Sequence, residues 1–132
     1  MDIVIHNDKS RSTIEVRKHS EDEQGNIFTV RKKFSVRWKD KSISIPAGFE
    51  SDGASVPRIF WGLVFPSEDL TALRAAIVHD YIYRNAPSGW TRKEADMAFR
   101  DIMIRDGVDK TRAYVVYYSV RMFGEKYWRG KA

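Results

Sequence analysis

The segment LTALRAAIVHDYIYRN, residues 70–85, has the spacing of a helix that is apolar on more than one side. At about 100° per residue, its large apolar side chains fall on two faces. The first face carries Leu70, Leu73, Ile77 and Tyr81, and the second carries Val78 and Ile82. Such a helix is normally buried in the middle of its domain. We therefore predict a central helix, on which Ile77→Ala costs roughly 2–5 kcal/mol of stability and the flanking Arg74→Ala costs much less.

This helix would carry an imidazole and a carboxylate, His79 and Asp80, into the core. An unpaired buried charge costs several kcal/mol or more, so Asp80 needs a cation, a hydrogen-bond network or an opening to water. The small residues Ala72 and Ala76 share a face with His79, and we expect them to leave space above the ring. For this pair alone, a buried histidine paired with its neighbours is the simpler interpretation.

Upstream of the helix, residues 1–46 have the alternation of strands. Asp2–Ile5 and Thr13–Arg17 are short runs with β-branched residues, separated by polar segments. Apolar residues then recur with a period of two through residues 28–30, 34–38 and 43–45, and Pro46 ends the pattern. We predict an antiparallel meander of about four strands.

Residues 47–66 have neither a helical nor a strand pattern. The core of this stretch, AGFESDGASVPRIFW at residues 47–61, combines turn residues with large apolar ones. A loop of this kind is unfavourable unless its backbone groups have partners. We expect an ordered loop.

Three helices are predicted downstream. The first runs from Ser67, a good N-cap followed by acidic residues, to about Arg84. A Thr-x-x-Glu capping box at residues 91–94 opens the second, which ends at Gly107. The third runs from Asp109 to Gly124. The basic and aromatic tail, residues 125–132, could touch lipid, although docking on the core is favoured. The fold class is therefore α+β, in a single domain of 132 residues.

Asp96 lies at the edge of the apolar stripe of the second helix. A boundary aspartate is usually solvated, but a short link between the first two helices makes them antiparallel neighbours. Asp96 can then face His79 and hold one ring nitrogen. Such a contact fixes the tautomer and leaves the other nitrogen as a general base.

Asp52 and Asp80 could meet across the loop with a cation between them. Oxygen ligands suit calcium or magnesium, and Gly53 lets backbone carbonyls approach closely. With two acidic ligands we expect weak calcium binding, toward ~10⁻⁴–10⁻³ M. Alternatively, Asp52 caps its own Asp-Gly turn, which is nearly as well supported on local grounds.

Several other chemistries fit less well. The chain has no cysteine, hence no thiol nucleophile and no disulfides. Ser55 is not in the Gly-x-Ser-x-Gly elbow of a serine hydrolase, and no glycine loop cradles phosphate. HD-type phosphohydrolases also carry a His-Asp pair, but they need more histidines near it. The other two histidines here, His6 and His19, lie in the region of the predicted strands. The net charge of +5 is spread evenly, with 11 basic and 9 acidic residues in positions 1–66 against 12 and 9 in positions 67–132. Nucleic acid is therefore an unfavoured partner.

The motifs IPAGFESDGASVPRIFW at residues 45–61 and HDYIYR at residues 79–84 resemble a family of small tailed-phage and prophage proteins. That family is known as a domain of unknown function. The resemblance covers about residues 34–124.

Residues 51–124 also resemble the small prokaryotic secreted phospholipases A2. Ser51-Asp52-Gly53 is similar to their calcium loop, His79-Asp80-x-x-Tyr83-Arg84-Asn85 to their catalytic helix, and the segments from Asp96 and Tyr117 to their later helices. The resemblance implies that His79 is the general base on water, that Asp96 orients it, and that Asp52, Asp80 and a backbone oxygen near Gly53 hold calcium. Those enzymes are secreted and disulfide-bonded, and they lack the N-terminal strands.

These features predict a phage-encoded, calcium-dependent esterase acting on lipid or a related acyl ester. The alternative is a non-enzymatic virion or accessory protein that keeps the fold as a scaffold. Candidate partners are a phospholipid or membrane surface and phage virion proteins. The sequence has no signal-peptide pattern and no run of ~18 apolar residues, so we expect synthesis in the host cytoplasm, with association with the virion left open.

Overall fold

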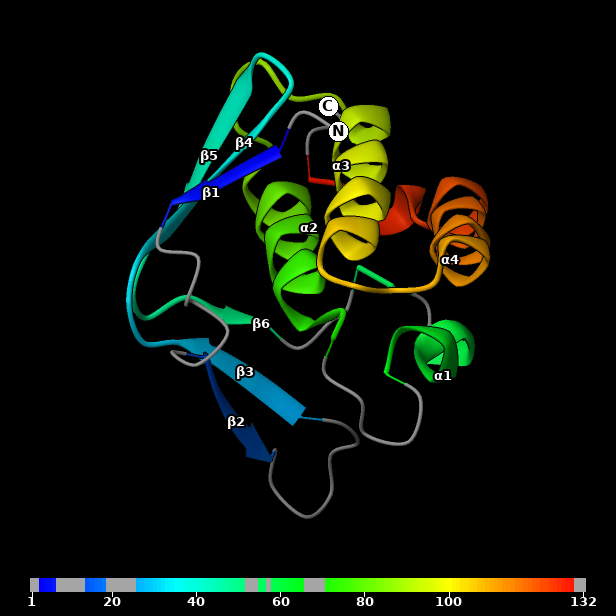
Figure 1. Cartoon of the computed structure of the whole chain (residues 1–132), viewed down its shortest axis with the longest axis horizontal. Coiled ribbons are helices and arrows are strands. Elements are labelled where there is room, and N and C mark those ends of the chain that lie inside the picture. The colour runs from blue at the N-terminus through cyan, green and yellow to red at the C-terminus, as the bar shows by residue number, and fades with distance from the viewer. Residues whose placement is uncertain are drawn as a thin grey trace. The chain divides into compact units, whose positions relative to one another are not determined.

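A computed structural model describes residues 3–6, 14–18, 26–51, 55–56, 58–65 and 71–129. The fold is α+β, as predicted: short antiparallel strands precede three main helices (Figure 1). The chain divides into two compact units, residues 2–53 and 54–132. The prediction of a single domain stays a prediction. Within the described residues, no helix is both long and apolar enough to cross a bilayer.

The first unit contains two antiparallel sheets rather than the predicted single meander. One sheet has the strand order β1 (Ile3–His6), β4 (Phe34–Trp38), β5 (Lys41–Ile45). The other has the order β2 (Ile14–Lys18), β3 (Asn26–Val30), β6 (Glu50–Ser51). The strands are antiparallel, as predicted, but they do not all pair in chain order, because β1 pairs with β4 while β2 pairs with β3. An alternating pattern identifies a strand but not its partner.

The alternation within the strands is confirmed. Phe34, Val36 and Trp38 are buried on β4, while Ser35 and Arg37 are less so. The register places Phe34 opposite Ile45 and Val36 opposite Ile43 on β5. The buried side chains of β4 and β5 therefore share one face of this hairpin. Pairs of side chains on the same face of adjacent strands stabilise a sheet.

The segment 47–66 contains more regular structure than predicted. It includes β6, the 3₁₀ helix η2 (Arg58–Phe60) and the short helix α1 (Trp61–Val64). The expectation that its polar groups would have partners is confirmed where they are described. Val30 exchanges backbone hydrogen bonds with Gly48 and Phe49, at 2.7 and 3.0 Å. The indole Nε1 of Trp61 donates to the carbonyl oxygen of Val56 at 3.1 Å.

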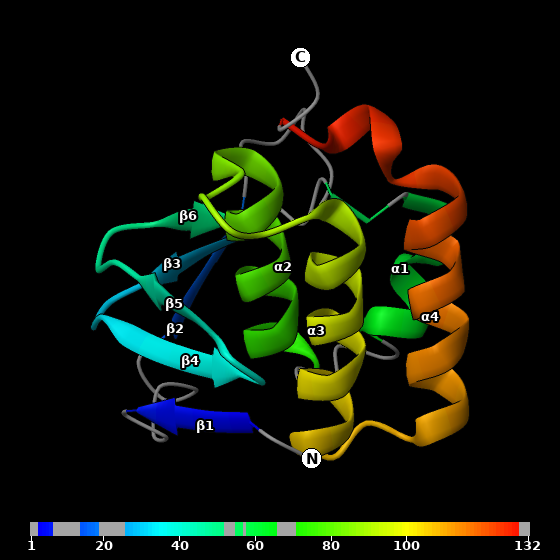
Figure 2. The same ribbon diagram turned by 90° about the horizontal axis from the view of Figure 1, so that it is seen from above.

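The second unit is built on α2 (Leu73–Asn85), α3 (Arg92–Arg105) and α4 (Lys110–Phe123), which run side by side in alternating directions (Figure 2). The capping box of α3 is present, because Thr91 Oγ1 accepts from the Glu94 amide and Glu94 accepts from the Thr91 amide. Asp109 caps α4 through the Arg112 amide. Helix α2 begins at Leu73, after a turn at Thr71 and Ala72, and the predicted cap Ser67 lies outside the described residues.

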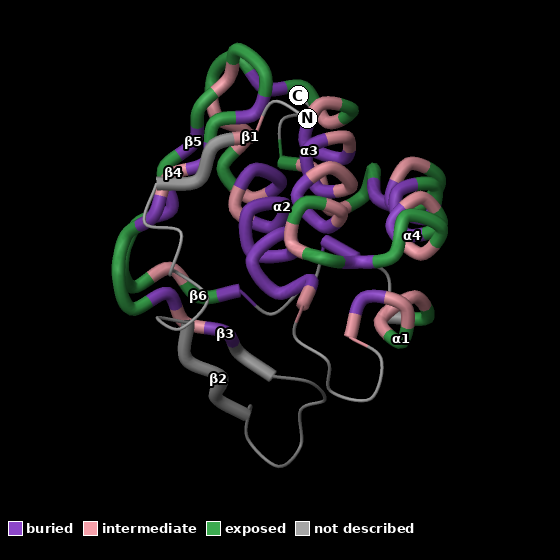
Figure 3. Tube along the Cα trace, in the orientation of Figure 1, coloured by how far each residue is buried: buried purple, intermediate pink, exposed green. Residues whose placement is uncertain are grey.

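Helix α2 is the buried centre of this unit, and most of its length is in the buried class (Figure 3). Residues 73–80, Ile82 and Tyr83 are buried, and exposure increases at the end of the helix, where Arg84 is intermediate and Asn85 exposed. Among the described residues of the two predicted faces, all are buried except Tyr81, which is half-buried. Leu70 lies outside the described residues.

The environment of Arg74 differs from the prediction that this residue flanks the buried helix. Arg74 is 1% exposed, and it donates two hydrogen bonds to Asp106, Nε to Oδ2 at 3.1 Å and Nη2 to Oδ1 at 2.6 Å. The expectation that Arg74 flanks the buried faces is therefore wrong. This is a bidentate guanidinium–carboxylate pair. It links the start of α2 to the residue that follows α3.

We now expect Arg74→Ala to lower the free energy of unfolding by about 3–5 kcal/mol, because it leaves a buried carboxylate without its main partner. Arg105→Ala is the matched control. Its Nη1 is also 3.1 Å from Asp106 Oδ1, but its side chain is 31% exposed, so about 1 kcal/mol or less is expected. Chemical denaturation measures both, and equal losses in the two variants would contradict the burial of the pair.

Candidate functional site

His79 lies between two hydrogen-bonding partners that come from different parts of the chain. Its Nε2 is 2.7 Å from Asp96 Oδ1 on α3, and its Nδ1 is 3.0 Å from Ser55 Oγ in the turn before η2. The exposed fractions are 0% for His79, 0% for Asp96 and 2% for Ser55. The predicted placement of Asp96 against His79 is confirmed. The catalytic roles of both residues stay predictions.

The Asp96 carboxylate is surrounded by donors. Tyr83 Oη donates to Oδ1 at 2.7 Å, and Arg121 Nη1 donates to Oδ2 at 2.8 Å. Arg92 Nη1 lies 3.6 Å from Oδ2. Burial alone would raise the pKa of Asp96, but the hydrogen bond and charge of His79, followed by the Tyr83 and Arg121 bonds, hold this pKa below its ordinary value. Asp96 is therefore ionised at neutral pH.

An ionised carboxylate can only accept hydrogen bonds, so the proton in the 2.7 Å contact lies on His79 Nε2. In the neutral ring Nδ1 then carries a lone pair, and the Ser55 hydroxyl donates to it. The two hydrogen bonds fix both the tautomer and the orientation of the ring. This arrangement leaves Nδ1 as the basic nitrogen and points it at a hydroxyl.

The faces of the imidazole are covered, contrary to the expected space above the ring. The Tyr83 ring lies 4.2 Å away and the Phe99 ring 4.4 Å away, centroid to centroid. Ala72 and Ala76 are themselves buried. Protein side chains therefore cover both faces of the ring, and its Nδ1 edge faces Ser55, which lines the polar pocket.

The end of α4 is tied to the same network. Arg92 donates to the carbonyl oxygens of Val120 and Arg121 at 3.0 and 3.2 Å, which gives two carbonyls of the last turn a partner outside the helix. Gly124 has an ordinary φ of −84°, so it is not needed for a left-handed turn. A Cβ at position 124 would lie 2.8 Å from Tyr83 Oη and 2.5 Å from the Val120 oxygen. Glycine is required there by close approach.

The tail docks on α2, as favoured from the sequence. The Arg129 amide donates to the Tyr83 carbonyl oxygen at 3.0 Å, and the Trp128 ring meets the Tyr83 ring edge-on at 5.4 Å. Burial and then the charge of Asp96 raise the pKa of the Tyr83 phenol well above its usual range. Tyr83 is therefore a permanent donor to Asp96.

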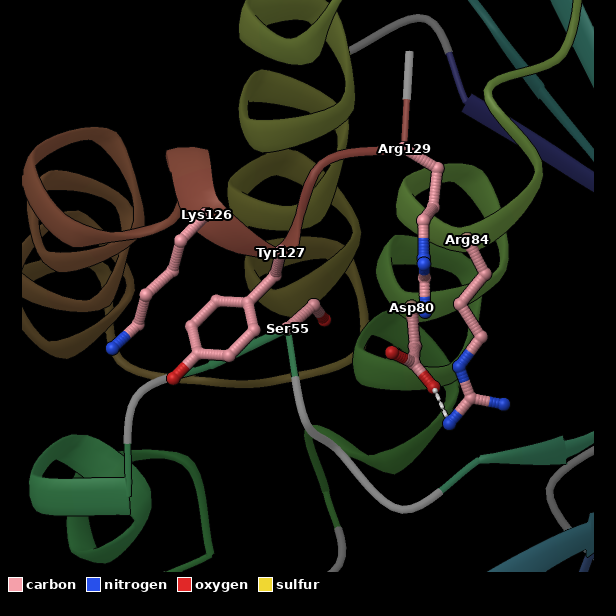
Figure 4. A pocket seen from close by; sticks show the side chains of 6 residues that line it. All are labelled: Ser55, Asp80, Arg84, Lys126, Tyr127 and Arg129. Atoms are coloured by element: carbon pink, nitrogen blue, oxygen red, sulfur yellow. Dashed lines mark ion pairs between the residues drawn. The ribbon is translucent and has the colours of Figure 1, made fainter. Parts of the chain in front are cut away.

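A polar pocket of about 200 Å³ opens beside this network (Figure 4). Its lining residues are Ser55, Asp80, Arg84, Lys126, Tyr127 and Arg129. Asp80 is 1% exposed, and its Oδ2 lies 3.1 Å from Arg84 Nη2. Of the alternatives left open for Asp80, a cation is present, and it is an arginine one turn along the same helix. The lining carries three basic groups against one acidic group, which favours an anionic ligand.

The predicted calcium ligands Asp52 and Gly53 lie outside the described residues. The described residues contain no group of three or more His, Cys, Asp or Glu side chains able to hold a metal ion. Of the predicted ligands, only Asp80 is described, and a guanidinium already pairs with it. One carboxylate is too few donors for a calcium site, so the described residues do not test the calcium prediction, which stays a prediction. We therefore derive no catalytic step through calcium.

Ser55 is the site residue that sequence reasoning set aside. No elbow motif surrounds it, and 24 positions separate it from His79. A signal was nevertheless present, because a small hydroxyl residue stands within an apolar loop whose polar groups need partners. Local patterns could not indicate which partner it finds.

Comparison with known proteins identifies relatives but no activity. The family described as "Protein of unknown function (DUF1353)" matches residues 28–120. The uncharacterized protein y4iH of Sinorhizobium fredii is 31% identical over 78 residues, 59% of this chain and 32% of that protein. The uncharacterized protein y4jT of the same organism is 29% identical over 80 residues, 61% of this chain and 23% of that protein. The matched region thus spans about a third or less of these relatives. No solved structure matches the chain.

The lowered pKa of Asp96 gives a prediction for acid unfolding. Ionised Asp96 contributes fully to the free energy of unfolding at pH values above 3.8, the ordinary pKa of the group in the unfolded chain. This contribution is lost as the pH falls through the lower pKa that Asp96 has in the folded protein. Asp96→Asn removes this titration. We expect the wild type to lose unfolding free energy more steeply than Asp96→Asn below about pH 4. Denaturant titrations across this pH range measure the slopes, and parallel acid limbs would contradict an ionised, donor-bound Asp96.

Proposed function

The chain belongs to the DUF1353 family of proteins of unknown function. We propose that it is an ester hydrolase in which His79 is the general base and Asp96 orients it. The supporting observation is the orientation of the ring. Asp96 holds Nε2, and the remaining nitrogen is directed at a hydroxyl that lines a polar pocket. General bases are commonly built this way, with the second ring nitrogen fixed by a carboxylate.

In this mechanism His79 takes a proton at Nδ1 from the attacking nucleophile and returns it to the leaving alcohol. Asp96 stabilises the imidazolium that forms between these transfers, and Arg121 and Tyr83 keep Asp96 ionised and in place. The basic groups that line the pocket beside Ser55 would stabilise the negative charge that develops on a bound ester. Burial of the dyad strengthens these interactions, because little water screens them.

The substrate class we propose is a lipid or a related acyl ester. An apolar hollow of about 560 Å³ lies at the end of α4, and it shares Lys126 with the polar pocket. Its lining includes the exposed apolar side chains Ile59, Met122 and Phe123. A molecule with a charged part and an apolar part matches this pair of neighbouring surfaces. The resemblance to secreted phospholipases A2 supports the same class.

The setting we propose follows the resemblance to small phage and prophage proteins. The chain would be phage-encoded and made in the host cytoplasm, and it would act on a phospholipid surface or among virion proteins. The family match and the two relatives carry no activity that bears on this setting.

Calcium is part of the proposal through the resemblance of the Ser51-Asp52-Gly53 segment to a calcium loop. If Asp52, a backbone oxygen near Gly53 and Asp80 bind calcium, millimolar calcium raises the melting temperature, because a ligand that binds only the native state stabilises it. Asp80→Asn abolishes the rise. Arg84→Gln is the informative control, because removing the guanidinium from Asp80 should strengthen calcium binding. Identical melting curves in calcium and in chelator would remove the metal from the proposal.

A second candidate is a non-enzymatic scaffold of the virion or an accessory protein. The observation that favours it is the complete burial of His79, whose ring nitrogens both have partners inside the protein. A histidine that serves only packing needs this arrangement, whereas a general base must reach its substrate. The two candidates therefore differ in whether proton transfer at Nδ1 matters.

His79→Gln separates the two candidates. Glutamine can donate to Asp96 and accept from Ser55, but it cannot take up a proton at neutral pH. For a hydrolase we expect nearly unchanged stability and a loss of ester hydrolysis of about 10²-fold or more. Asp96→Asn should lose less of the ester hydrolysis, because it removes the group that orients the His79 ring and leaves the base itself in place. Thermal melting and hydrolysis of phospholipid and nitrophenyl esters measure both properties. A wild type inert on every ester, with a destabilised His79→Gln variant, would support the scaffold instead.

A further inference from the structure

We propose that Ser55 is the nucleophile of this site and forms a covalent acyl-enzyme. The inference rests on the proposed hydrolase and deepens it, because the resemblance to phospholipases A2 implies direct attack by water. In the structure, the position beside Nδ1 that such a water would occupy holds the Ser55 hydroxyl at 3.0 Å. The proton most readily taken by His79 is therefore that of the serine.

The three side chains form a relay of the Ser-His-Asp type with the two ring nitrogens exchanged. Serine faces Nδ1 at 3.0 Å, and aspartate faces Nε2 at 2.7 Å. Both distances are within the range expected of a nucleophile, its base and the group that orients the base. Either nitrogen can serve as the base, provided that the other carries the proton. The donors around Asp96 meet that condition.

Ser55 stands on a turn that is held in place. Its neighbour Val56 accepts from the Trp61 indole at 3.1 Å, and Val56 is itself buried. A serine fixed in this way loses little freedom when it reacts, which is the advantage of a pre-organised nucleophile. No Gly-x-Ser-x-Gly elbow is needed if the turn and the Trp61 contact supply the rigidity.

The hydroxyl also has access to a ligand. Ser55 lines the polar pocket, and Figure 4 shows it with Asp80, Arg84 and Arg129 on one side and Lys126 and Tyr127 on the other. Basic side chains on both sides of the serine favour an ester that carries a negative charge close to the scissile carbonyl. They would also stabilise the oxyanion that forms during attack.

The reaction balances without a further reactant besides water. Ser55 Oγ bonds to the ester carbonyl carbon while its proton passes to His79 Nδ1. The bond to the leaving alcohol then breaks, and His79 returns the proton to the alcohol oxygen. In the second half, water gives a proton to Nδ1 and attacks the acyl carbon, and the proton returns to Ser55 as the carboxylic acid leaves.

A fluorophosphonate probe and a nitrophenyl ester test this inference on the full chain. We expect intact mass to show one phosphonyl adduct, mapped to the Ser55 peptide. A burst of nitrophenol equal to the enzyme concentration should precede steady turnover. Ser55→Ala should lose the adduct and the burst, and its turnover should fall by at least about 10³-fold.

Ser119→Ala is the matched control, because Ser119 is also buried but, within the described part of the chain, its hydroxyl bonds only the Val116 carbonyl oxygen of its own helix. It should keep the adduct and the burst. Ser55→Cys covers the case in which Ser55→Ala fails to fold, since a thiol there should be alkylated by iodoacetamide at a rate that depends on His79. Hydrolysis without a burst, with turnover retained in Ser55→Ala, would overturn the inference and leave the hydrolase standing. A wild type with neither hydrolysis nor adduct would overturn both.

Discussion

The hydrogen-bonded Asp96 carboxylate is the interaction on which the rest of the second unit depends. A carboxylate without exposure to solvent is unfavourable unless donors compensate it, and here the donors come from helices on both sides of α3. His79 and Tyr83 reach it from α2, and Arg121 reaches it from α4. Satisfying one charge therefore fixes how three helices pack. The same requirement sets the state of the imidazole.

This arrangement links stability and chemistry in a way that a purely apolar core could not. Arg92 bonds the last carbonyls of α4 and also approaches Asp96 and Tyr83. Gly124 can only be glycine, because a side chain there would collide with the Tyr83 hydroxyl. Residues that look like ordinary helix ends in the sequence thus hold the donors in place. A buried polar network of this kind is favourable only when every member is satisfied.

Much of the fold could be predicted because its signals are local. The capping box at Thr91 and Glu94, the cap at Asp109 and the alternation through β4 each depend on neighbouring residues. Asp96 could be placed against His79 because a short link between two amphipathic helices leaves few ways to pack them. The pairing of β1 with β4, the contact of Arg74 with Asp106 and the contact of Ser55 with His79 could not be predicted. Each joins residues more than twenty positions apart, and no local pattern marks the partner.

The most direct test of this account is the protonation of the two His79 nitrogens, measured by ¹⁵N NMR through their couplings to the ring protons at pH 8. His79→Gln assigns the signals, because the chain has three histidines. The account predicts a protonated Nε2 and an unprotonated Nδ1 that accepts from Ser55. A proton on Nδ1, or rapid exchange between the two tautomers, would contradict it, because Asp96 would then not be fixing the ring.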